Sequence, residues 1–119
     1  MDGMNVVGSR PTGWWGDRPG AMRELVESLE GLAARSGDAI TVVFDGSPLE
    51  LEAEGGVEVL FASRRGRDAA DDDIATLVER DDDPAGLSVV SSDADLARRV
   101  REAGATVMGA GEFRRRLDL

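Results

Sequence analysis

Short apolar runs alternate along this chain with longer amphipathic segments, and the alternation leaves few folds open to it. The apolar runs are rich in β-branched residues and too short for typical helices, so they predict buried strands. They cover residues 40–44, 57–62, 87–90 and 106–108. Because strands that alternate with helices usually lie parallel in one sheet, the pattern predicts an α/β fold.

The amphipathic segments between these runs are predicted to be helices. They cover residues 19–35, 72–80, 94–103 and 110–117. In the first of them, Pro19 lies near the start and Gly37 stops the helix. The whole chain of 119 residues is expected to form a single domain, since most domains have about 50 to 250 residues.

Several kinds of site are excluded by residues that the sequence lacks. Without cysteine it cannot form disulfides or thiol nucleophiles, and without histidine it cannot form a Ser/His/Asp triad or an imidazole zinc site. It also has no run of roughly 20 apolar residues and no basic N-terminal segment followed by an apolar run. We therefore expect a cytoplasmic protein, with no membrane partner, that works by carboxylate and arginine chemistry.

The formal charge of −10 disfavours binding of DNA or membrane by the whole surface, because such binding needs a basic footprint. All fourteen basic residues are arginine, and most of them form three clusters. The clusters at 98–101 and 114–116 lie in predicted helices, where a solvated face is the stronger interpretation. The third cluster lies in a predicted loop. For this cluster, phosphate binding and a solvated surface are equally good interpretations. It consists of Arg64, Arg65 and Arg67.

Aspartates follow the predicted strands closely. Asp45 comes directly after residues 40–44, Asp93 comes soon after 87–90, and Asp72 stands near the start of the helix that follows 57–62. Because parallel strands end at one shared edge, where ligands bind, these side chains are expected to converge. Clustered carboxylates repel one another unless a cation neutralises them, and Mg²⁺ or Mn²⁺ prefers such oxygen ligands. The joint placement predicts a metal site.

Each acid alone also has a structural interpretation. Asp45 begins a plain turn sequence with Gly46, while Asp71 and Asp93 could cap the helices that follow them. The acidic run at 81–83 is best interpreted as a solvated loop. For any single aspartate this interpretation is the stronger one, so the metal-site prediction depends on their joint placement.

Five blocks of sequence carry a more specific signal. They are DGMNVVGSRPTGWWGDRPGA at 2–21, TVVFDG at 41–46, AADDDIATLV at 69–78, VVSSDADLARRV at 89–100 and the GATVMGAGEFRRRL ending. In order and spacing they resemble the YacP-like branch of the NYN-domain, PIN-like nucleases. The resemblance covers nearly the whole chain, and DGMN and GWW are its most distinctive parts.

The resemblance implies a three-layer α/β/α, PIN-like (Rossmannoid) fold with a mainly parallel central sheet and the strand order 3-2-1-4-5. It also implies an endoribonuclease with an acidic site for Mg²⁺ or Mn²⁺, and some relatives are associated with ribosomes. Matched position by position, the catalytic and metal-binding residues are Asp2, Asp72 and Asp93. The supporting residues are Asn5, Asp45, Asp71, Ser91 and Asp95.

The expected reaction is hydrolysis of an RNA phosphodiester by a metal-bound water. No covalent intermediate is expected, because the chain has no thiol and no histidine-activated nucleophile. The arginines at 64–67 would hold flanking phosphates. Trp14 and Trp15 would stack on an unpaired base, although for at least one of them the preferred alternative is that it pins its loop to the core.

The N-terminus departs from the family pattern. In the family the DGMN aspartate ends the first strand, which is the centre of the sheet, whereas here only Met1 precedes Asp2. Either residues 1–7 supply a short piece of that strand, or the first strand is truncated at the N-terminus. We expect the second.

Two other kinds of protein compete with the nuclease interpretation. The first is a non-catalytic RNA- or ribosome-binding module that keeps the fold. The second is a phospho-acceptor, receiver-like domain, which also gathers aspartates at one sheet edge. Such domains ordinarily use a lysine at the phosphoryl group, and the chain has none, so this alternative ranks low.

Overall fold

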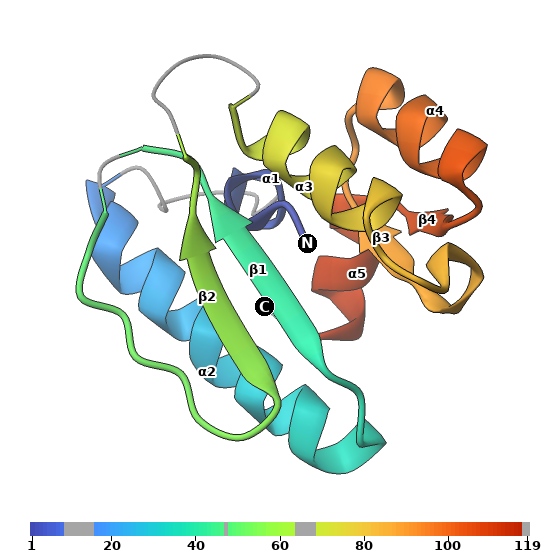
Figure 1. The fold of residues 1–119 in the computed structure, drawn as a ribbon. Coiled ribbons are helices and arrows are strands. Elements are labelled where there is room, and N and C mark those ends of the chain that lie inside the picture. The colour runs from blue at the N-terminus through green and yellow to red at the C-terminus, as the bar shows by residue number, and fades with distance from the viewer. Residues whose placement is uncertain (9–15, 47, 64–68, 118–119) are drawn as a thin grey trace.

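The computed structural model describes residues 1–8, 16–46, 48–63 and 69–117, with only the backbone of Asn5. Helices and strands alternate along the chain (Figure 1), which confirms the predicted α/β fold. In chain order the elements are α1 (Gly3–Gly8), α2 (Arg18–Ser36), β1 (Ile40–Phe44), β2 (Val57–Phe61), α3 (Ala69–Glu79), the 3₁₀ turn η2 (Pro84–Gly86), β3 (Ser88–Val90), α4 (Ala94–Ala103), β4 (Thr106–Met108) and α5 (Ala110–Arg116). No described helix combines the length and apolar character that a membrane span needs.

The described strands form two parallel pairs. β1 pairs with β2, so that Ile40 lies opposite Val57, and β3 pairs with β4, so that Ser88 lies opposite Thr106. The predicted parallel arrangement is therefore confirmed. The strand order 3-2-1-4-5 is not confirmed, because two two-stranded sheets replace one continuous sheet in the described part of the chain.

Residues 1–2 lie between the two pairs and join them. Asp2 forms an isolated parallel bridge with Val43 of β1, and its amide donates to the carbonyl of Val90 in β3 at 3.1 Å. The Met1 carbonyl accepts from the Val43 amide at 2.8 Å. The backbone of two residues thus connects β1 to β3, although it is too short to form a regular strand.

The helix α1, which begins directly after this bridge, was not predicted. Its residues Val6 and Val7 are fully buried in the core, so tertiary burial stabilises a helix too short to show helical periodicity in the sequence. Gly3 permits its close approach to β1, since a Cβ at this position would collide with the ring of Phe44. The strand-like alternative for residues 1–7 was therefore wrong beyond Asp2.

Helices cover both faces of the strands. Val42 and Phe44 pack with α1, α2 and Ala110 of α5, whereas Val43, between them in sequence, packs with α3 and α4. This alternation is the period of two expected for a strand that is buried on both faces. The two cores fix the strand ends relative to the first turns of the helices, and these ends position the acidic side chains.

The helix boundaries follow local capping signals. The Asp17 side chain accepts from the Gly20 amide at 3.0 Å to start α2, and Gly37, at φ 76°, ends it. Gly104, at φ 110°, ends α4 in the same way. α3 begins three residues before the predicted start at 72, because Ala69 and Ala70 are buried and join the helix.

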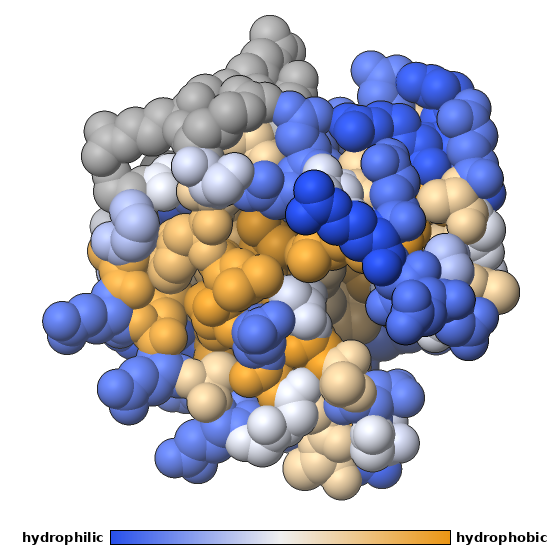
Figure 2. All heavy atoms as spheres, viewed as in Figure 1, coloured by the Kyte–Doolittle hydropathy of each residue, from blue (hydrophilic) through white to orange (hydrophobic). Residues whose placement is uncertain are grey.

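A groove of about 640 Å³ opens beside Met1, between β1 and β3. It is lined by the strand residues Ile40, Thr41 and Val89 and by Ile74 and Val78 of α3, among others. Figure 2 shows apolar side chains gathered around a hollow on this face. The groove thus lies beside Met1 and is bordered by both β1 and β3.

Candidate functional site

Asp2 lies at the junction of the two strand pairs. It is only 4% exposed, next to the bridge with Val43. Its negative charge acts on the neighbouring Met1 ammonium, whose pKa is lowered to about 6 by burial and raised in part by this carboxylate. The structure thus places Asp2 in the interior, near the ends of β1 and β3.

Asp45 follows β1 and holds the start of α3. Its Oδ1 accepts from the Ala70 amide at 2.9 Å, and its backbone carbonyl accepts from the guanidinium of Arg18. Gly46 follows in the left-handed region at φ 95°, a backbone conformation that favours glycine. Asp45 is therefore a structural residue that connects β1, α2 and α3.

Asp93 caps α4. Its Oδ1 accepts from the Leu96 amide at 2.8 Å, and its own amide donates to Oγ of Ser91 at 3.1 Å. Ser91 is only 2% exposed, whereas Asp95 is exposed in the first turn of α4. The cap interpretation of Asp93 is confirmed. It is compatible with ligand binding, because the cap uses only one of the two carboxylate oxygens.

The N-terminal half of α3 carries three consecutive aspartates with different surroundings, and the first two of them lie in its first turn. Asp72 pairs with Arg99 of α4, with Oδ1 and Nη1 2.8 Å apart. Asp73 accepts from the amide of Ser63 at 2.6 Å and from its hydroxyl at 2.8 Å, which ties α3 to the end of β2. Asp71 precedes them inside the helix and does not lie at its cap position.

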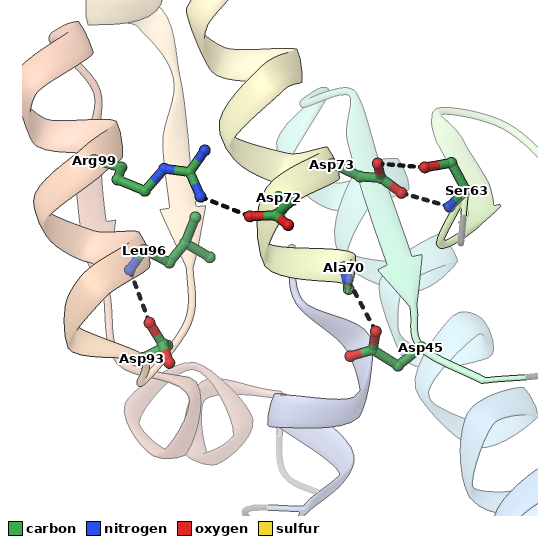
Figure 3. Close-up of polar contacts among 8 residues, drawn as sticks. All are labelled: Asp45, Ser63, Ala70, Asp72, Asp73, Asp93, Leu96 and Arg99. Atoms are coloured by element: carbon green, nitrogen blue, oxygen red, sulfur yellow. Dashed lines mark hydrogen bonds and ion pairs between the residues drawn. The ribbon is translucent and has the colours of Figure 1, made fainter. Parts of the chain in front are cut away.

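Figure 3 shows how these acids lie relative to one another. Asp45, Asp72 and Asp93 come from the end of β1 and from the beginnings of α3 and α4, on the same side of the domain. Among the described residues, however, no three acidic side chains lie close enough together to hold a metal ion. The oxygen donors suit Mg²⁺ or Mn²⁺ in kind, but their arrangement here does not fit such an ion.

The comparisons with known proteins identify the family. A family model described as the YacP-like NYN domain matches residues 1–119. The chain belongs to the YacP-like NYN domain family. No protein with a curated function matches it.

Solved structures with a similar fold are also known. The crystal structure of Rae1 (YacP) from Bacillus subtilis superimposes with a TM-score of 0.80 at 23% identity, over 98% of this chain and 71% of that one. Its W164L mutant gives 0.79 at 23% identity, over 98% and 72%. This NYN domain therefore shares its fold with those proteins across almost its entire length.

Several predicted site residues of the NYN domain lie outside the described part of the chain. These are the candidates for RNA contact: Trp14, Trp15, Arg64, Arg65 and Arg67. The same holds for the side chain of Asn5, whose backbone lies in α1. Their roles stay predictions.

The sequence of this NYN domain did not predict the contact between Arg99 and Asp72. Arg98 and Arg99 look alike in the sequence, but the first pairs with Glu102 one turn along α4, while the second reaches across to α3. Only the packing of α3 against α4 distinguishes them. The sequence contains no local signal for such a contact.

Proposed function

We propose that this protein is an endoribonuclease that hydrolyses RNA phosphodiester bonds with the help of Mg²⁺ or Mn²⁺. The YacP-like NYN family is nuclease-like, which supports ribonuclease activity in general without specifying a metal. The observation that carries the finer proposal is the position of Asp2, Asp72 and Asp93 beside strand ends and helix starts. Parallel α/β sheets bind their ligands at this edge.

The proposed metal-binding and catalytic residues are Asp2, Asp72 and Asp93, with Asp71, Asp95 and Asn5 in support. A bound divalent ion would supply an activated water and offset charge on the leaving oxygen. Two hydrogen bonds hold Asp93 in place. Its carboxylate accepts from the Leu96 amide, and its backbone amide donates to Oγ of the buried Ser91. Asp45 supports the same edge of the strands, because its carboxylate accepts from the Ala70 amide at the start of α3.

The family's strand order is part of the proposal. We assign residues 1–2 to the central position, so that the spatial order becomes β2, β1, residues 1–2, β3, β4, which is the order 3-2-1-4-5. The hydrogen bonds from residues 1–2 to both β1 and β3 support this assignment. The packing of α1, α2 and α5 on one face and of α3 and α4 on the other supports the three-layer arrangement.

RNA recognition is assigned to residues on the loops. Arg64, Arg65 and Arg67 would bind flanking phosphates, and Trp14 or Trp15 would stack on a base. Ribosome-associated RNA is the proposed substrate class, by analogy with ribosome-associated members of the family, and the cytoplasm is the proposed location. These assignments rest on the sequence.

Cleavage of end-labelled single-stranded RNA in Mg²⁺ or Mn²⁺, with and without a chelator, tests the proposal. The variants are Asp72→Asn and Asp93→Asn, with Asp82→Asn in the exposed 81–83 loop as the matched control. Asparagine also caps helices well, so Asp93→Asn should remain folded. Both site variants and the chelator should reduce cleavage roughly 100-fold or more, while the control cleaves normally. Undiminished cleavage in excess chelator would contradict the mechanism.

A non-catalytic RNA-binding module is the second candidate. The specific observation in its favour is that the described acids do not gather into a group of three. This candidate predicts that labelled RNA is retained in a binding assay, with or without Mn²⁺, and is never cut. The nuclease proposal predicts Mn²⁺-dependent fragments from the same RNA.

A further inference from the structure

The side chain of Arg18 reaches from the start of α2 to the turn that follows β1. Its Nη2 donates to the backbone carbonyl of Asp45. Gly46, the next residue, has φ 95°, and a Cβ at this position would lie only 2.6 Å from Nη2. The turn at 45–46 thus leaves room for the guanidinium and fixes it at the carboxyl end of β1.

The charge of Arg18 lies in a half-buried position. Its contact with Asp45 is to the neutral peptide carbonyl, because the carboxylate of that residue accepts from the Ala70 amide instead. Within the part of the chain that the structure describes, Arg18 forms no ion pair, whereas Arg99 pairs with Asp72. A charge that is partly removed from water is costly without a counter-charge, so this position favours an anion.

Arg18 lies at the same edge of the strands as the candidate acids. Asp45 follows β1 directly, and its carboxylate holds the start of α3, which carries Asp72 in its first turn. Parallel sheets bind their ligands beyond the carboxyl ends of the strands. An anion held by Arg18 would therefore lie at the proposed ligand-binding edge.

A phosphodiester is the anion that suits a guanidinium in this place. The guanidinium has five N–H donors in a planar fork, and the fork matches two oxygens of one phosphate. The bond to the Asp45 carbonyl uses a donor at Nη2, and no other described residue accepts from Arg18. Its Nε and Nη1 can therefore donate to a phosphate while Nη2 keeps its contact with the turn.

We propose that Arg18 is a substrate-binding residue that holds a phosphate of single-stranded RNA beside the turn at 45–46. The inference rests on the proposed function, and it adds an RNA contact to those expected from the loops. In the sequence Arg18 lies outside the three arginine clusters, so only the fold brings it to this edge. Binding of RNA without any metal should therefore depend on Arg18.

Arg35 provides a matched control on the same helix. It lies in the last turn of α2, is exposed and is not a candidate site residue. Arg18→Gln and Arg35→Gln remove the same charge from positions roughly 25 Å apart along the helix, which exceeds the screening length of about 8 Å in physiological salt. A difference in RNA binding between the two variants is therefore not an effect of net charge.

The first measurement is fluorescence anisotropy of a labelled oligouridylate in excess chelator, over about 50 to 200 mM salt. We expect Arg18→Gln to bind roughly 10-fold more weakly than the parent, and its slope of log K against log salt to be shallower by about 0.7. Arg35→Gln should stay within about 2-fold of the parent, with an unchanged slope. Weaker binding of Arg18→Gln with an unchanged slope would mean that Arg18 only supports the turn, which overturns the inference.

The second measurement does not depend on whether Arg18→Gln folds. Because the chain contains no lysine, Arg18→Lys introduces its only side-chain amine and keeps the charge. Oligouridylate should slow the acetylation of this amine by a succinimidyl ester several-fold, as read by peptide mass spectrometry. In Arg35→Lys the rate should be the same with and without RNA. An unprotected amine in Arg18→Lys, under conditions where the chain binds RNA, would overturn the inference.

Failure of the inference can be distinguished from failure of the proposed function. If the parent binds RNA but Arg18→Gln and Arg35→Gln bind it equally, the role of Arg18 is wrong and the proposed function stands. If the parent binds no RNA in chelator, the inference is wrong, and RNA cleavage in Mn²⁺ decides the proposed function separately.

Discussion

The amino group of Met1 lies in an unusual place for a charge. It donates to the carbonyl of Thr41 at 2.8 Å, and burial, opposed in part by the Asp2 carboxylate, lowers its pKa from 8.0 to about 6. An ammonium ion in the interior is costly, because the folded protein replaces little of the water around it. In the middle of a sheet, an uncharged peptide N–H would make the same hydrogen bond without that cost.

This burial predicts a pH dependence of stability. Since the folded pKa lies below the unfolded one, the cost is fully present below pH 6, decreases between pH 6 and 8, and is absent above pH 8. The free energy of unfolding should therefore rise by on the order of 2–3 kcal/mol from pH 6 to pH 8. Urea unfolding at the two pH values measures it.

A chain acetylated at its N-terminus is the control, because it cannot carry the charge. It should be equally stable at both pH values, and the comparison is clean because the chain has no histidine to titrate in this window. Equal pH dependence in the acetylated and free chains would contradict the burial of the charged amine.

Asp45 illustrates how a predicted site residue can be structural. Its Oδ1 accepts from the Ala70 amide at the start of α3. Asp45→Ala should cost about 1 kcal/mol of stability, as loss of a helix cap does, whereas Asp45→Asn should cost much less because its amide oxygen can still accept. Denaturant unfolding of the two variants measures the difference. A loss of stability as large in the asparagine variant would assign the effect to charge.

Elements buried on both faces were the most predictable from the sequence. The run 40–44 is mostly apolar and rich in β-branched residues, and β1 has those bounds because both of its faces are covered. α1 was missed because six residues are too few for a periodicity to be visible. Its helical form depends on burial against β1 and α2, which local sequence does not encode.

The groove beside Met1 leads to a prediction about β1 and β3. In the register set by Met1 and Asp2, an extension ahead of Met1 would run parallel to both strands, past Thr41 and Ser88. We expect a four-residue extension of valine and isoleucine to raise the melting temperature above that of a Gly-Ser extension of equal length by several degrees.

The Gly-Ser chain is the appropriate reference for this comparison. Both extensions turn the buried ammonium of Met1 into a peptide N–H, so removal of the charge contributes equally to both. Any difference then reflects strand pairing and burial in the groove. Equal melting temperatures would mean that the groove does not accept a strand.

At the scale of the whole molecule, the chain keeps the fold of a Bacillus subtilis relative at 23% identity. The α/β class with parallel strands was predictable, because the alternation of strands and helices survives such divergence, whereas the strand order is not confirmed. The arrangement of the candidate site was only partly predictable. Strand ends indicated which acids would lie near one edge, but the partners of Asp72 and Asp93 depend on how α3 and α4 pack.

The proposed function requires that acids from separate elements of this fold bind one divalent cation. Anomalous diffraction from crystals grown with Mn²⁺ tests it most directly. We predict a manganese peak within coordination distance, about 2.1 Å, of oxygens from Asp72 and Asp93, and close to Asp2. Crystals saturated with Mn²⁺ that show no manganese at these carboxylates would contradict the account.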